Sequence, residues 1–444
     1  MFKTIRDAFK VKEIRNGIIF TFCILIVVRL GSLIPTPGVN TAELSNFFAN
    51  NLGDGANSLL DSFTGGSFSQ MSIFALSVTP YITSSIIMQL LTIAIPALEE
   101  MQKDGEDGRK KITAITRVVS VGLAIIEGTG LSIGFGRSGL LLSYDTGLHK
   151  FLSVAVIVLT LTAGSTFIMW LGERITEKGI GNGVSIILLI NIVSRMPNDF
   201  VNLYDMFVKG KDLVKMIFAI IIIVAVVFIT TILTILLNDA TRRIPVQYAQ
   251  KVQGRRQVGG NSTHIPLKVN TGNVMPIIFA STLMSIPNIV TNLFNINVKS
   301  LVVQRIFEGL NSNYWFRPGY PWAYIGLVLY IVLVVFFAYF YTSISFNPME
   351  IANNLKKQGG FVPGIRPGKS TQDYLNKILN YIVIIGAIGL IIVALIPIFF
   401  NGRFSADVSF GGTSLIIVCG VIIETIKQIE SKMVVRNYEG FLSK

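Results

Sequence analysis

The chain has 444 residues, of which 51% are hydrophobic and only 14% are charged, and its mean hydropathy is +0.61. Soluble domains carry about 25% charged residues, so this composition argues against a soluble enzyme and excludes a disordered chain. The net charge is nevertheless +13. These values together favour a membrane protein with several spans, whose basic residues lie in its loops.

Ten apolar runs are long enough to cross the hydrocarbon core of a bilayer, which takes about 18 residues or more in a helix. The runs are continuous rather than alternating, so helices are expected. The first run contains Arg29, lacks a small-residue cleavage site and is followed by nine others, which favours a retained span over a signal peptide. The sequence therefore predicts an all-α membrane protein. The predicted spans are 17–34, 73–95, 112–133, 151–171, 180–196, 213–238, 271–293, 322–344, 377–400 and 411–430.

Basic residues predict the orientation of these spans. Ten spans place both termini on one side, and if that side is the cytoplasm, nearly all of the net charge of +13 falls on the inner face. Two inner loops, 239–270 and 345–376, are much longer than the others and rich in Lys and Arg. Two interpretations stand: these loops are topology determinants, or they form a docking surface for an acidic or phosphate-bearing partner.

Segment 57–72 lies between the first two spans and is too short to cross a membrane. Gly65 and Gly66 form a hinge just before the second span. The segment is either an ordinary outer loop or a half-inserted segment that plugs a cavity, because non-helical backbone at membrane depth persists only against protein or water.

Glu127 is the sole acidic residue well inside an apolar run, and Asn288 lies in the seventh run. Polar groups within a membrane are costly and usually face a polar cavity, but they also serve as structural hydrogen bonds between helices. Both interpretations stay open for these two residues.

Nothing in the sequence supports catalysis, a cofactor or a metal. Residues 134–139, GFGRSG, match a dinucleotide pattern but follow a membrane helix instead of a strand. Residues 363–370, PGIRPGKS, resemble a phosphate-binding loop, but Pro363 replaces its first glycine. Two cysteines in apolar runs and two histidines leave little material for a metal site. We therefore expect no enzymatic activity and no cofactor.

Six motifs stand in order along the chain. They are RLGSLIPTPG at 29–38, SIFAL at 72–76 with PYITSSIIMQLLT at 80–92, GERITEKGIGNG at 172–183, STHIPLKVN at 262–270, GGFVPGIRPG at 359–368 and FGGTSL at 410–415. Together they closely resemble the SecY family, the pore subunits of the bacterial protein translocase. The resemblance extends from about residue 10 to about residue 440.

This resemblance implies two inverted five-helix halves, at 1–196 and 197–444, arranged like a clamshell around an hourglass channel. A ring of aliphatic side chains would close the waist of the channel. Branched apolar side chains offer no hydrogen bonds and dewet a constriction. Ordinary helix packing is the alternative role for each of them, and Leu188 replaces the more usual isoleucine. The matching positions are Ile82, Ile86, Leu188, Ile192, Ile278 and Ile417.

The resemblance also implies a plug, a lateral gate and a docking face. Segment 57–72 would be the plug, and the second and third spans would open against the seventh and eighth. Basic residues of the two long loops would receive SecA, the motor ATPase, or a ribosome with its RNA, and SecE and SecG would be membrane partners. The residues implied are Leu60, Phe63, Gly65 and Gly66 for the plug, Thr92, Glu127 and Asn288 for the gate, and Arg255, Arg256 and Arg366 for docking.

The function expected from the resemblance is a passive, gated, protein-conducting channel in the bacterial cytoplasmic membrane. It would translocate unfolded secretory preproteins, recognise their signal peptides and release transmembrane segments into the lipid bilayer. The alternative drawn from the residues is a secondary transporter for a small solute. That alternative would need a polar site at the midplane, for which Glu127 is the obvious candidate.

Overall fold

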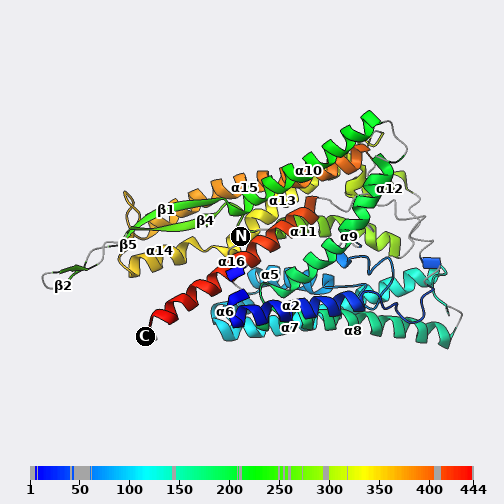
Figure 1. The fold of residues 1–444 in the computed structure, drawn as a ribbon, viewed down its shortest axis with the longest axis horizontal. Helices are drawn as coiled ribbons and strands as arrows, with labels where there is room; N and C mark the ends of the chain where they lie inside the picture. Colours follow the sequence, from blue (N-terminus) through cyan, green and yellow to red (C-terminus); the bar gives the residue numbers. More distant parts are fainter. Residues whose placement is uncertain are drawn as a thin grey trace.

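The computed structural model consists of long helices with a small β-sheet projecting from one end (Figure 1). The shorter helix α12 (Leu301–Leu310) lies at the opposite end (Figure 1). The structure describes residues 6–7, 9–40, 43–44, 61, 63–142, 147–207, 209, 213–248, 251–253, 256–258, 262–272, 274–293, 300–317, 319–404 and 412–442.

Each predicted apolar run overlaps one long helix of the described chain. Seven helices in the described residues are long and apolar enough to cross a membrane, or eight if α5 and the short helix α6 (Pro96–Lys103), bent by 102°, form one span. The long helices are α2 (Lys12–Gly31), α5 (Thr79–Ala94), α7 (Glu106–Arg137), α8 (Leu148–Lys178), α9 (Gly183–Phe207), α10 (Leu213–Asp239), α11 (Met275–Leu293), α13 (Ala323–Ser345), α15 (Lys369–Phe404) and α16 (Gly412–Leu442).

The second predicted span begins later than its apolar run indicates. Residues 73–78 form turns, and helix α5 starts only at Thr79. Ser77 adopts a φ of 49°, which a helix does not allow, and Pro80 occupies the first turn, where its missing N–H costs nothing. Apolar character therefore continues through residues whose backbone is not helical.

The long helices pack in two groups that follow the chain. Helices α2, α5, α7, α8 and α9 contact one another, and so do α10, α11, α13, α15 and α16. Among the described residues, α7 touches α11, while α9 touches α10 and α16. The two groups therefore meet along one seam between α7 and α11 and another beside α9.

Glycine permits the closest contacts in the first group. A Cβ at Gly164 of α8 would lie 1.9 Å from the carbonyl oxygen of Ile73, and a Cβ at Gly183 would lie 1.8 Å from that of Gly172. Both distances are far below van der Waals contact. The turns before α5 and the start of α9 can therefore press directly against the backbone of α8.

The two long loops share a three-stranded β-sheet, which corrects the purely α-helical prediction. Strand β1 (Thr241–Tyr248) pairs antiparallel with β4 (Ser262–Lys268) and with β5 (Gly360–Phe361). Ile244 and Val246 alternate with exposed residues on β1 and lie buried against α15 side chains such as Leu375. A short hairpin joins β2 (Lys251–Gln253) to β3 (Arg256–Val258), and helix α14 (Pro348–Lys357) precedes β5.

Candidate functional site

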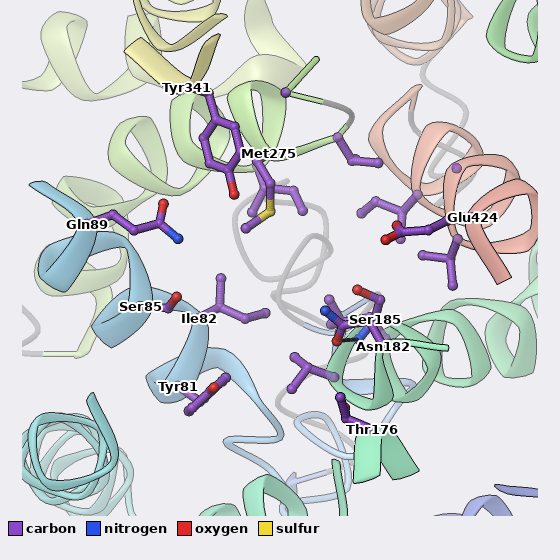
Figure 2. Close-up of a pocket in the computed structure, with 18 of the residues that line it drawn as sticks. Tyr81, Ile82, Ser85, Gln89, Thr176, Asn182, Ser185, Met275, Tyr341 and Glu424 are labelled. Carbon is purple, nitrogen blue, oxygen red and sulfur yellow. Dashed lines mark hydrogen bonds between the residues drawn. The ribbon is translucent and has the colours of Figure 1, made fainter. Parts of the chain in front are cut away.

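A cavity of about 630 Å³ lies between the two groups of helices (Figure 2). Its wall combines polar and apolar side chains, and Gln89 of α5, Tyr341 of α13 and Glu424 of α16 point into it (Figure 2). Charged residues line it as well, among them Lys268 at the end of β4, which places this part of the cavity beside the β-sheet. The cavity is therefore a polar vestibule at the sheet end of the molecule.

Aliphatic side chains from four helices also line this cavity. Ile82, Leu188, Ile278 and Ile417 line it, from helices α5, α9, α11 and α16. All six positions expected in the aliphatic ring belong to one hydrophobic cluster. Leu188, Ile192, Ile278 and Ile417 are buried within it, whereas Ile82 and Ile86 are half-buried and pack against it. Tertiary structure thus brings together four helices that are far apart in sequence.

The residues before α5 are buried, unlike those of an ordinary outer loop. We call Asp61 and residues 63–78 the turn segment. Asp61 and Met71 are fully buried, and Phe63 packs against the cluster that holds the aliphatic positions. Backbone hydrogen bonds tie the segment to the chain after α2: the Thr36 amide donates to Met71 O at 2.9 Å, and the Ile73 amide donates to Ile34 O at 2.9 Å.

The expected hinge lies within this segment. Gly65 has a φ of 67° and Gly66 a φ of 88°, in the left-handed region that favours glycine. Leu60 lies outside the described residues. The turn segment therefore folds back among the helices, with two consecutive glycines at its bend.

The expected gate residues are placed on the helices that meet at one seam, but no described contact joins them. Thr92 of α5 is buried, and its hydroxyl donates to Met88 O of its own helix at 2.6 Å. Glu127 is half-buried on α7. Asn288 belongs to α11, and its side chain lies outside the described residues.

The expected docking residues belong to the two loops that share the sheet. Arg366 is exposed in the turn between β5 and α15, and its backbone oxygen accepts a hydrogen bond from the Thr371 hydroxyl at 2.9 Å. Arg256 begins β3, but its side chain, like the whole of Arg255, lies outside the described residues. The guanidinium of Arg366 is thus presented on the projecting end of the molecule.

Sequence reasoning missed two ionic features of the site. Arg117 of α7 and Glu173 of α8 form an ion pair of 2.6 Å in the vestibule wall. Asp61 of the turn segment is paired with Arg195 of α9. The second pair joins residues 134 positions apart, and local hydropathy carries no signal for such a partnership.

This fold and cavity define a multi-span membrane protein with a cavity between two groups of helices. The SecY family model matches residues 72–426. The protein translocase subunit SecY of Thermotoga maritima is 42% identical over 448 residues, covering 100% of this chain and 98% of that protein. The Bacillus subtilis subunit of the same name is 40% identical over 453 residues, covering 100% of both chains. The chain belongs to the SecY family.

Solved structures show the same fold. A structure described as a protein-conducting channel matches with a TM-score of 0.62 at 17% identity, covering 97% of each chain. Sec61 in a canine ribosome-channel complex matches with a TM-score of 0.57 at 17% identity, covering 96% of this chain and 94% of that one. The alternative of a small-solute transporter receives no support from these relatives.

Proposed function

We propose that this chain is a protein-conducting channel, which moves unfolded secretory polypeptides across the bacterial cytoplasmic membrane. The observation that carries the proposal is the cavity between the two groups of helices, whose wall combines polar side chains with Ile82, Leu188, Ile278 and Ile417. A polar wall suits a hydrated, extended polypeptide of any sequence. Aliphatic side chains close around such a chain without binding it, and they exclude water and ions when the channel is at rest.

The turn segment serves as the plug of this channel. Phe63 packs against the hydrophobic cluster that holds the aliphatic positions, which supports a segment that seats against the constriction. A relative's structure is described as showing that the plug domain of SecY stabilises the closed state and maintains a membrane seal. The burial of most residues of this segment and the glycine bend within it support the same role here.

The two groups of helices act as halves of a clamshell, at 1–196 and 197–444, with ten spans and both termini in the cytoplasm. The seam between α7 and α11 opens toward lipid, while the contacts of α9 with α10 and α16 act as the hinge. An apolar segment of about 20 residues in the pore would then partition into the bilayer, whereas polar chain would continue through the constriction. Thr92, Glu127 and Asn288 are the proposed polar residues of this gate.

The projecting sheet is the docking surface for the partner that supplies the energy for translocation. Arg255, Arg256 and Arg366 are the proposed contacts, since guanidinium groups bind both carboxylates and RNA phosphates in bidentate geometry. The partners proposed are the motor SecA or a ribosome, with SecE and SecG in the membrane. Two structural relatives, canine Sec61 and the yeast Ssh1 complex, are described in complexes with ribosomes, which supports the ribosome as a partner.

Site-specific crosslinking to an arrested secretory precursor tests the channel. Cysteines placed by Ile86→Cys and Ile278→Cys should form adducts with the arrested chain. Ile325→Cys on α13 is the matched control, because Ile325 is 74% exposed on the outside of the bundle and should face lipid. Adducts at Ile325 equal to those at Ile278, or none at either pore position, would remove the constriction from the path of the polypeptide.

A further inference from the structure

Buried polar contacts fasten the turn segment to helix α9. The carboxylate of Asp61 pairs with the guanidinium of Arg195, and the Asp61 side chain is only 1% exposed. Its other oxygen, Oδ1, accepts a hydrogen bond from the backbone amide of Ser69 at 3.1 Å. Both carboxylate oxygens are therefore engaged, one by α9 and one by the turn segment itself.

A second residue of α9 holds the segment at two further points. Asn191 lies one helical turn before Arg195, so the two side chains share one face of α9. Its Nδ2 donates to the carbonyl oxygen of Phe63 and to the hydroxyl of Ser77, both at 3.1 Å. Asn191 thus bridges the beginning and the end of the turn segment.

Helix α2 contributes a weaker contact from the other side. Arg29 Nη1 donates to the carbonyl oxygen of Gly65 at 3.3 Å. Gly65 lies at the bend of the segment, between the points held by Asp61 and Asn191. The segment is consequently held by directional polar contacts at its start, its bend and its end, in addition to the apolar packing of Phe63.

We propose that Arg195 and Asn191 are positioning residues that latch the plug of this channel in its closed position, assisted by Arg29. The inference rests on the proposed function and assigns a role to residues that neither the pore nor the gate uses. Apolar packing is not directional and would let the segment slide. A buried carboxylate, by contrast, strongly disfavours any position in which it loses its cation.

The surroundings of Arg195 also make the latch reversible. Asp199 lies one turn beyond Arg195 on the same face of α9, is 3% exposed and acts on the guanidinium electrostatically. When the segment leaves with Asp61, Asp199 still neutralises Arg195, and Asp61 moves toward water. Release therefore strands neither charge in an apolar environment, which keeps the barrier to opening low enough for a translocating chain to overcome.

Single-channel recording in planar bilayers tests the latch on the purified channel reconstituted with its membrane subunits. Arg195→Ala and Asp61→Asn should each raise the resting open probability roughly ten- to a hundredfold, as the loss of one charge-assisted hydrogen bond implies. The conservative variant Arg195→Lys, which keeps a cation beside Asp61, should stay closer to the wild-type value. Retention of closure by this variant separates a positional role from general structural damage.

A matched control lies just beyond the C-terminal end of α9. Lys209 forms an exposed pair with Asp205 at 3.0 Å, so Lys209→Ala removes a cation from this region without touching the turn segment. It should keep the wild-type resting open probability. Recordings count only channels that have folded and inserted, so a poor yield of one variant does not imitate the result, and Asn191→Ala gives an independent second measurement.

The latch is overturned if Arg195→Ala, Asp61→Asn and Asn191→Ala all remain as closed as the wild type, or if Arg195→Lys opens as often as Arg195→Ala. Failure of the proposed function looks different, since it is the absence of adducts between an arrested precursor and the cysteine introduced by Ile278→Cys. A channel that forms those adducts but does not leak in the Arg195→Ala variant would retain the function and lose the latch.

Discussion

Replacing Gly65 with alanine tests how tightly the turn segment packs against α9. Gly65 has a φ of 67°, and an added Cβ would lie 2.8 Å from Arg29 Nη1 and 2.9 Å from the Asn191 Cα. The end of the Arg29 side chain can move aside. The backbone of Asn191 belongs to a packed helix and cannot, so the turn segment itself must shift.

The cost to the closed position follows from two effects. A left-handed backbone costs an L-residue about 1–2 kcal/mol, and overpacking against a rigid neighbour adds about 1–3 kcal/mol. The closed position should therefore lose roughly 2–5 kcal/mol relative to positions in which the segment has moved away. Since about 1.4 kcal/mol is a factor of ten, the resting open probability should rise at least tenfold.

Gly66→Ala provides the control. Gly66 has a φ of 88°, but an added Cβ would meet only the Arg195 side chain, at 3.7 Å, which is ordinary contact. This variant therefore carries the backbone strain without the collision. Resting conductance in planar bilayers should rank Gly65→Ala above Gly66→Ala and both above the wild type. Equal conductance of the two variants would refute the close approach to Asn191.

Two further predictions concern the projecting sheet. Arg366→Glu should abolish partner-driven translocation in proteoliposomes and leave resting conductance unchanged, because its side chain lies on an exposed turn away from the pore; a normal translocation rate would remove Arg366 from the docking surface. Ile244→Ala, at a side chain 1% exposed, should destabilise the sheet by about 2–5 kcal/mol. Hydrogen exchange of β1 and β4 amides measures this, and unchanged protection would contradict the buried core under the sheet.

The positions of the helices could be predicted because the signal for them is local. A run of apolar residues long enough to cross a bilayer forms a helix whatever its neighbours are, since only internal hydrogen bonds satisfy the backbone in lipid. The same signal fails at residues 73–78, which are as apolar as the helix they precede. Their turns depend on Ser77, Pro80 and the close approach of Ile73 to Gly164 of α8, which hydropathy does not record.

The β-sheet could not be predicted from the sequence, for a similar reason. Strand β1 offers only a short alternation of Ile244 and Val246 among basic and polar residues. Its partners β4 and β5 come from two loops that are separated by more than one helix in the chain. Charge could single out the two basic loops, and resemblance to the SecY family could single out Arg366, but the sequence does not show that both loops share one sheet.

By itself, the sequence determined the membrane class, the apolar runs, the excess of basic residues in two loops and the motifs of the SecY family. Hydropathy, charge and motif spacing are properties of neighbouring residues, so no tertiary information is needed to read them. Only the tertiary structure decided that aliphatic residues of four helices lie together at one cavity. It also decided that Asp61 pairs with Arg195, which is 134 positions away in the chain. These contacts depend on how the helices pack. Packing is determined by the complementary shapes of whole helix surfaces, which no short segment of the sequence specifies.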